Sequence, residues 1–295
     1  MKFREQCFFF CILMISLLVP SSPWVGAAAA QGGPDLTADQ VEISTPLYRP
    51  NFSGFEQQLG TFTYKVSWQG ISAAEAKISV YKEGDYYRIL TQARTNSFID
   101  MFYRMRFWAK AKISAKSLLP TFMTTHSKEN SRLKEAEITF LPDGTVKSVR
   151  RDNGIESLRL NFNPKNLMLD PFSAVFLARG LNWELGETKK FDTFNGKARY
   201  LISLTAIDRV LIPVNGVPRD TWVISPQVKR LTGTGDDSKK IREARIYVTN
   251  DKARDVLKIE SEVFVGTVTT RLTSYAALAK PTAVAAASEA GSSVF

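Results

Sequence analysis

The sequence is poor in the residues that most often carry enzyme chemistry. Its 295 residues include one histidine, His126, and two cysteines, Cys7 and Cys11, which both lie in an apolar run near the N-terminus. Beyond that run there is no thiol for a disulfide, a nucleophile or a cysteine-ligated metal. A single histidine also excludes a zinc site built from several histidines. We therefore predict no metal and no cofactor, and we expect His126 to lie on the surface.

The motifs of common catalytic sites are also missing. The sequence has no Gly-x-Ser-x-Gly turn, P-loop, dinucleotide-binding glycine pattern or His-Glu-x-x-His helix. Two acidic pairs remain, Asp236 with Asp237 and Asp251 with Asp255. Such pairs would suit a cation or a hydrolase of envelope polymers, but neighbouring loop carboxylates are usually solvated turn residues. We predict that the protein is not an enzyme and has no catalytic residue.

Charge is unbalanced, with 39 Lys and Arg against 29 Asp and Glu and a formal net charge of +10. This balance favours anionic partners such as lipid headgroups, envelope polysaccharide or nucleic acid. Residues 98–108 mix aromatic residues with arginines, as membrane-interface and nucleic-acid-binding segments do. No further basic cluster extends the pattern. We expect an amphipathic segment with its aromatic side chains in the core and its arginines in water, and no nucleic-acid partner.

The N-terminus has the three parts of a secretory signal peptide. Lys2 and Arg4 precede an apolar run over 7–19, and the alanines of 27–30 form a small-residue cleavage zone. We predict a signal peptide over 1–30 and localisation in the periplasm, with a retained N-terminal anchor as the alternative. The apolar run is too short to favour a spanning helix, so we expect no transmembrane span after leader removal.

Composition divides the remaining chain into three parts. Residues 31–57 are polar, contain proline and glycine, and predict a flexible arm. Residues 58–275 predict a β-rich domain. Residues 276–295 are rich in alanine and serine and predict a disordered tail.

Strand patterns dominate the predicted domain. Phe62, Tyr64, Val66 and Trp68 alternate with polar residues, as expected for one face of a strand. About a dozen such runs are joined by short turns, among them Pro-Asp-Gly at 142–144 and Asn-Gly at 195–196. Short linkers indicate antiparallel neighbours, and so long a sheet must curl or close. We predict a mainly β fold with a single curled antiparallel sheet, like a half-barrel or β-spiral.

One helix is clearly marked, near 171–179. Asp170 suits the N-cap, Pro171 the first helical position, and Gly180 a left-handed residue after the end. The apolar residues between them have helical spacing and need a surface to cover. We expect this helix to cover the concave face of the sheet.

Three stretches, 60–76, 169–174 and 248–272, resemble in order and spacing a family of periplasmic bacterial proteins known as domain of unknown function 3108. The resemblance implies an exported β-rich domain without an assigned reaction, and it carries over no catalytic residues. In shape the predicted sheet is also similar to the curled half-barrels of periplasmic lipoprotein carriers, a likeness of fold alone.

The apolar lining of such a sheet is either a packed core or a cavity for an acyl chain or another apolar ligand. The candidate ligand-binding residues are Phe62, Tyr64, Trp68, Ile78, Val80, Phe172 and Phe176. Our leading hypothesis is a non-enzymatic periplasmic protein that binds an apolar or amphiphilic envelope component, such as a lipid, and approaches anionic envelope surfaces. The alternative is a surface-mediated scaffold that binds polysaccharide or protein partners.

Overall fold

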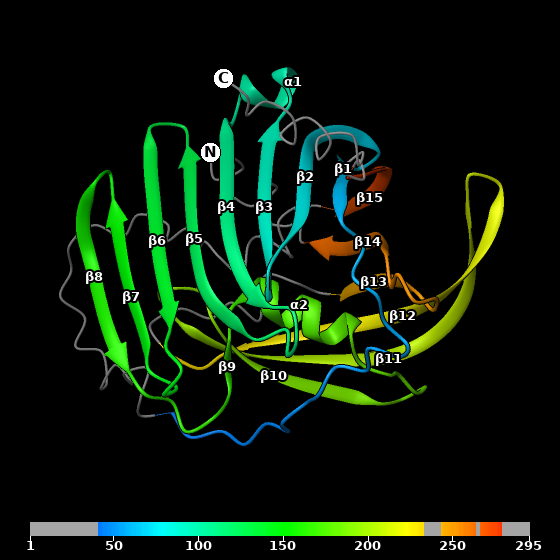
Figure 1. The fold of residues 1–295 in the computed structure, drawn as a ribbon. Helices are drawn as coiled ribbons and strands as arrows, with labels where there is room; N and C mark the ends of the chain where they lie inside the picture. Colours follow the sequence, from blue (N-terminus) through cyan, green and yellow to red (C-terminus); the bar gives the residue numbers. More distant parts are fainter. Residues whose placement is uncertain (1–40, 233–242, 264–265, 279–295) are drawn as a thin grey trace, which may run out of the picture.

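A computed structural model describes residues 41–232, 243–263 and 266–278. These residues form one open sheet of 15 strands with two short helices (Figure 1). The elements are β1 (Gly60–Trp68), β2 (Ile71–Glu83), β3 (Tyr86–Thr95), α1 (Ser97–Asp100), β4 (Met105–Ser114), β5 (Pro120–Glu129), β6 (Arg132–Phe140), β7 (Val146–Asp152), β8 (Ile155–Phe162), β9 (Met168–Leu169), α2 (Pro171–Arg179), β10 (Thr188–Phe194), β11 (Arg199–Val214), β12 (Val217–Arg230), β13 (Glu243–Thr249), β14 (Val256–Val263) and β15 (Gly266–Ala277). The predicted mainly β class and the main helix are confirmed.

The strands follow the order β8-β7-β6-β5-β4-β3-β2-β1-β15-β14-β13-β12-β11-β10-β9. Neighbours are antiparallel except β9 and β10, which pair in parallel. Because β1 pairs with β15, the first and last strands of the domain meet in the middle of the sheet. The two halves of the chain are therefore locked together by a non-local pairing.

The sheet curls strongly. Strands β3 to β8 stand upright in Figure 1, whereas β10 to β13 run across them, and α2 lies between the two groups. Register shifts interrupt several pairings, including β1 with β2 at Val66 and Ser67 and β11 with β12 between Ala206 and Asp208. Such irregularities bend a strand and increase its twist. They help an antiparallel sheet to wrap around a helix.

Helix α2 begins as its sequence predicts. The Asp170 side chain accepts hydrogen bonds from the backbone N–H groups of Phe172 and Ser173, and Pro171 is the first helical residue. Seven of its nine residues are buried. The helix is thus covered on nearly all sides by the sheet that curls around it, not on one face alone.

The prediction of a left-handed Gly180 is wrong. Its φ is −76°, a right-handed value, and its N–H bonds to the carbonyl of Phe176. Glycine is needed there for space, because a Cβ would lie 3.0 Å from Leu118 Cδ1 and 3.1 Å from Pro50 Cβ. Close packing, rather than backbone conformation, accounts for the residue.

The described part of the predicted arm, residues 41–57, has no helix or strand but packs against the domain. Phe55 is buried, Tyr48 accepts a hydrogen bond from the N–H of Lys190, and Asn51 donates its N–H to the carbonyl of Gly180. These residues therefore extend the domain instead of leaving it. The predicted signal peptide, the rest of the arm, the tail beyond 278 and the pair Asp236 and Asp237 lie outside the described residues.

The segment that mixes aromatic residues with arginines forms α1 and the start of β4. Its aromatic side chains were expected in the core, and that expectation is wrong for Phe98, Phe102 and Trp108, which are exposed. Ile99 is the buried residue of this helix. No helix among the described residues is long and apolar enough to cross a membrane.

Candidate functional site

Helix α2 has an apolar cavity on each side. One, here called the β11 cavity, lies between α2 and strands β10 to β14. The other, the β1 cavity, lies between α2 and strands β1, β2, β14 and β15. Val175 and Arg179 of the helix and Val256 of β14 line both. The two cavities are therefore neighbours that share these three residues as a common wall.

The β11 cavity is walled almost wholly by carbon. Its lining is Pro171, Ala174, Val175, Ala178, Arg179, Trp183, Phe191, Ile202, Leu204, Ile224, Pro226, Val228, Ile246, Val248 and Val256. The cavity has a volume of about 80 Å³. Alternation along β11, β12 and β13 turns these apolar side chains toward α2. Nothing in this wall could carry a polar reaction except the Arg179 guanidinium.

The β1 cavity contains five of the seven predicted ligand-binding residues. Phe62 and Tyr64 come from β1, Ile78 and Val80 from β2, and Phe176 from α2. The antiparallel register places Phe62 opposite Ile78, which explains why residues 16 positions apart share one wall. The cavity has a volume of about 70 Å³.

Two predicted residues lie elsewhere. Phe172 is buried in the main core but does not line either cavity. Trp68 packs against a separate small cluster with Val66 and Val268. The register shift between Val66 and Ser67 and the end of β1 set Trp68 apart from Phe62 and Tyr64, although all have the same parity in the sequence.

The β1 cavity differs from the β11 cavity by its polar groups. Tyr64, Arg179, Asp255 and Thr270 are among its lining residues. Burial raises the pKa of the Tyr64 hydroxyl and lowers the pKa of the Arg179 guanidinium. Polar groups are thus concentrated on the β1 side of α2.

Arg179 fixes the end of α2 to the loop before β14. Its Nε donates to the carbonyl of Arg254 at 2.7 Å, Nη2 to the carbonyl of Ala253 at 2.9 Å, and Nη1 to Gln57 Oε1 at 3.1 Å. The guanidinium also lies 5.4 Å from the ring centre of Phe176. No carboxylate among the described residues lies within ion-pair distance of it, so backbone carbonyls and a carboxamide satisfy this cation.

Asp255 is the acidic group of the β1 cavity. Its side chain is buried, and burial raises the pKa of its carboxyl group. The expectation of a solvated turn residue is wrong here, because Asp255 is buried directly before the first residue of β14, whereas Asp251 is exposed and pairs with Arg219. Arg219 Nη2 is 3.7 Å from Asp255 Oδ2. The two acids thus differ in burial, although Arg219 lies near both.

Sequence reasoning missed Val175, Arg179 and the whole β11 cavity, and it named Asp255 only as part of an acidic pair with Asp251. Val175 was visible as part of the apolar spacing of the helix, and Arg179 as its basic last residue. Nothing local marks Asp255, since its burial depends on the pairing of β14 with β13 and β15. Among the described residues no group of three or more His, Cys, Asp or Glu side chains is placed to hold a metal ion.

A family model described as a protein of unknown function, DUF3108, matches residues 63–273, well over half of the chain. The chain belongs to the DUF3108 family. The match starts within β1 and ends within β15, so the DUF3108 domain coincides with the sheet. No curated protein matches this DUF3108 chain.

Two solved structures are similar to the DUF3108 domain. One is a β-barrel-like protein of domain of unknown function DUF1849 from Brucella abortus, with a TM-score of 0.49 and 9% identity over 75% of this chain and 98% of that chain. The other is a candidate lipoprotein from Parabacteroides distasonis, with a TM-score of 0.32 and 10% identity over 78% of this chain and 100% of that chain. At these identities the likeness concerns the fold alone.

Proposed function

We propose that this DUF3108 chain is a non-enzymatic periplasmic protein that binds an apolar or amphiphilic component of the cell envelope between α2 and the concave face of its sheet. The observation that carries the proposal is the pair of apolar cavities that flank α2 and share Val175, Arg179 and Val256 as a common wall. A helix whose only role was to fill the sheet would be packed as tightly as other protein interiors.

The shape and lining of the cavities support an apolar ligand. Small-molecule sites have walls that are mostly apolar with few polar groups, and volumes of roughly 300–1,000 Å³. The two cavities, of about 80 and 70 Å³, are narrow gaps between side chains rather than one wide chamber, so a ligand has to widen them as it enters. An alkyl chain matches this shape better than a fused ring system does.

The remaining parts of the proposal rest on the sequence. The N-terminal leader pattern supports export, and the formal charge of +10 supports approach to anionic envelope surfaces rather than to neutral ones. Nucleic acid is not part of the proposal, because the lining of both cavities suits an apolar molecule. The alternative of a surface-mediated scaffold for polysaccharide or protein predicts a filled core, and the two cavities weigh against it.

The direct test is native mass spectrometry, with solvent extraction of the protein purified from the cells that export it. We expect an apolar or amphiphilic molecule to co-purify at a near-stoichiometric level and to leave on extraction. A protein that is empty, and that also fails to bind the fluorescent probe N-phenylnaphthylamine, would overturn the proposal.

A change that fills the shared side of the cavities should weaken binding. Val175→Phe adds a ring at a residue that lines both cavities, and we expect probe affinity to fall by about tenfold, because the ring takes up space that the ligand would occupy. The matched control is Val217→Phe, at a residue on the exposed β11–β12 hairpin, which should bind as the parent does. Equal affinity of the two variants, with both folded by thermal unfolding, would contradict the prediction.

A further inference from the structure

Asp255, one of the residues that line the β1 cavity, has a polar atom that the fold leaves without a hydrogen-bond partner. Asp255 is 8% exposed, and its Oδ1 is buried without a hydrogen-bond partner. The backbone of the same residue is fully engaged, since its N–H donates to Thr249 Oγ1 at 2.8 Å and its carbonyl accepts from the N–H of Thr249 at 2.9 Å. The residue is therefore held firmly, with one carboxylate oxygen unpaired in the lining of an apolar space.

An unpaired oxygen of this kind is unusual. Buried polar groups nearly always form hydrogen bonds, and a buried group without a hydrogen bond lowers the stability of the fold. The nearest cation to the other oxygen, Arg219, is at 3.7 Å, beyond hydrogen-bond distance. The neighbouring Arg179 directs its guanidinium to two backbone carbonyls and to Gln57 instead. Asp255 Oδ1 thus lacks a hydrogen-bond donor, and a ligand of this cavity would have to supply a donor rather than an acceptor.

We infer that the ligand of the β1 cavity carries a hydrogen-bond donor, a hydroxyl or ammonium group, at the end of an apolar chain, and that Asp255 Oδ1 accepts it. This inference rests on the proposed function and adds the chemistry of the head group. A long-chain carboxylate brings only acceptors and a second negative charge next to Asp255, so the cavity should disfavour it.

The test uses three competitors with the same alkyl chain, namely dodecanol, dodecylamine and dodecanoate, to displace N-phenylnaphthylamine from the full chain. We expect the alcohol and the amine to bind about tenfold more tightly than the carboxylate, in line with one hydrogen bond to a charged acceptor. In Asp255→Leu, which has similar size and no acceptor, all three should bind alike. In Asp255→Asn, which keeps an acceptor oxygen without the charge, the alcohol should retain its advantage and the amine should lose it.

The outcomes separate the inference from the proposed function. If the probe and all competitors fail to bind the parent protein, the proposed function falls. If they bind and the order of the three head groups is the same in the parent and in Asp255→Leu, the cavity binds apolar chains but Asp255 does not select their head group. Should dodecanoate bind most tightly and lose affinity in Arg179→Gln, the head group would be an anion and the inference would be wrong.

A second surface, independent of the cavities, also indicates a ligand. The α1 tip, defined as Phe98, Met101 and Phe102, projects from the loop between β3 and β4. These side chains are 52%, 67% and 56% exposed, and the rings of Phe98 and Phe102 contact each other with centroids 5.8 Å apart. Adjacent exposed apolar groups are less common than single ones and often mark an interaction site.

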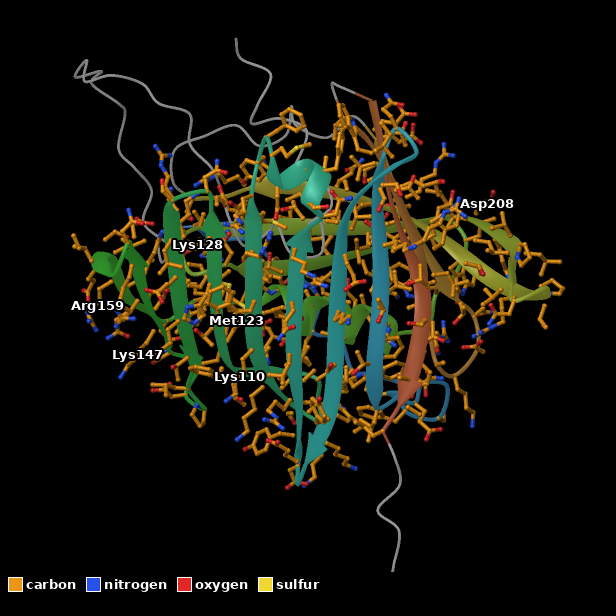
Figure 2. All side chains as sticks on the ribbon, turned by 90° about the horizontal axis from the view of Figure 1, so that it is seen from above. Lys110, Met123, Lys128, Lys147, Arg159 and Asp208 are labelled. Atoms are coloured by element: carbon orange, nitrogen blue, oxygen red, sulfur yellow. The ribbon has the colours of Figure 1, made fainter. Side chains whose placement is uncertain are left out.

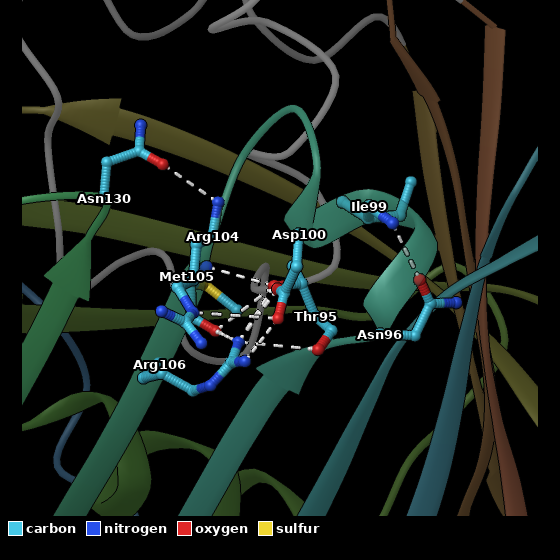
Figure 3. A network of polar contacts seen from close by, with 8 residues as sticks. All are labelled: Thr95, Asn96, Ile99, Asp100, Arg104, Met105, Arg106 and Asn130. Atoms are coloured by element: carbon cyan, nitrogen blue, oxygen red, sulfur yellow. Dashed lines mark hydrogen bonds and ion pairs between the residues drawn. The ribbon is translucent and has the colours of Figure 1, made fainter.

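The tip is exposed although its backbone is firmly held (Figure 3). Asn96 caps α1 by accepting a hydrogen bond from the N–H of Ile99 at 3.0 Å. The Asp100 carboxylate accepts from the Thr95 hydroxyl and pairs with the Arg106 guanidinium. This network, with buried Ile99, fixes α1 and the residues directly after it, so that Phe98, Met101 and Phe102 are exposed.

Positive charge lies on one side of the tip. The basic residues at this end of the sheet are Arg94, Arg104, Lys128 and Arg132, all exposed. The acids near them are paired, Asp100 with Arg106 and Arg104, Glu75 with Arg94, and Glu129 with Lys134. Figure 2 shows Lys128 at the α1 end of the sheet, whereas Lys110, Lys147 and Arg159 lie farther from α1. The surface is thus apolar at the tip and basic on the side of β5 and β6, where Lys128 and Arg132 lie.

We propose that the α1 tip inserts into the headgroup region of a bilayer that contains anionic phospholipid. Aromatic residues together with basic residues are typical of membrane interfaces. A protein partner fits less well, because stable protein interfaces bury about 800 Å² on each side and three side chains offer far less.

Vesicle sedimentation tests this proposal, with equal parts of phosphatidylglycerol and phosphatidylcholine against phosphatidylcholine alone. We expect binding to the anionic vesicles only, weakened by salt, and about a tenfold loss when Phe98, Met101 and Phe102 are all changed to Ser. The matched control changes Leu185, Leu211 and Val217 to Ser, since these residues are at least as exposed but lie elsewhere. All variants share the apolar N-terminal run, so the readout is the difference between them.

A second readout does not depend on loss of binding. Phe98→Trp should gain fluorescence that brominated lipid quenches, relative to the parent protein. Equal sedimentation of the tip and control variants would overturn the proposal. So would self-association in solution that the tip variant abolishes, because the tip would then bind a second copy of the chain.

Discussion

Replacing Asp192 by Ala should lower the free energy of unfolding by about 3–5 kcal/mol, among the largest effects of any single change in this protein. Asp192 on β10 and Arg199 on β11 form an ion pair in which both side chains are almost wholly buried. The pairing is bidentate, from Arg199 Nε to Oδ1 and from Nη2 to Oδ2 of Asp192. Removing the carboxylate leaves a cation that water cannot reach.

Urea unfolding at neutral pH measures the effect, and two variants interpret it. Glu156→Ala removes one partner of the exposed bidentate pair with Arg159 and should change the free energy of unfolding far less than Asp192→Ala does, because solvent screens that pair. The double change Asp192→Leu with Arg199→Met should recover much of the loss, because no unpaired charge then remains. A loss below about 1 kcal/mol in Asp192→Ala would show that water or another group compensates Arg199.

This pair also shows why the sequence predicted the strand pairing more readily than it predicted which polar side chains are buried. The Asn195-Gly196 turn is local, and it predicted the β10–β11 hairpin correctly. Burial of Asp192 and Arg199 depends on distant segments, since Arg199 Nη1 also donates to the carbonyl of Val41. An alternating strand pattern states which residues share a face, but not which face a charged pair will occupy.

The candidate site shows the same difference between features with a local sequence signal and features that depend on distant segments. Phe62, Tyr64, Ile78, Val80 and Phe176 were found because alternation in strands and helical spacing mark apolar faces. The pairing of β1 with β15, which closes the wall around Asp255, joins residues more than 200 positions apart and has no local signal. The α1 tip was misplaced for a related reason: its helical spacing was correct, but Ile99 is the buried residue, and Phe98 and Phe102 are exposed.

Asp170 should make the stability of the protein depend on pH in the direction opposite to most of its acids. The side chain is fully buried at the N-cap of α2, and burial raises the pKa of its carboxyl group to about 6 despite hydrogen bonds from Phe172 and Ser173. A folded-state pKa above the ordinary 3.8 means that the folded protein holds this proton more tightly than the unfolded chain. The favourable contribution is complete below the ordinary pKa and is lost as pH rises through about 6.

Other carboxyl groups work against this contribution, so a titration of the parent protein alone would not show it. The pKa of Asp220, for example, is lowered to about 2 by Arg209 and Asn250, and it contributes stability that is lost in acid. The comparison with Asp170→Asn isolates Asp170, because Asn keeps an acceptor for the N–H groups of Phe172 and Ser173 and has no charge. All other groups titrate equally in the two proteins.

We expect the stability of Asp170→Asn relative to the parent to rise by about 2 kcal/mol between roughly pH 4.5 and pH 7, from the linkage of the shifted pKa. Asp170→Ala removes the cap as well, and should cost about 1–2 kcal/mol relative to Asp170→Asn at both pH values. Urea unfolding of the three proteins at both pH values gives these differences. A constant difference between Asp170→Asn and the parent would mean that Asp170 ionises in the folded protein as it does in water, and that α2 begins at a hydrated, not a buried, N-cap.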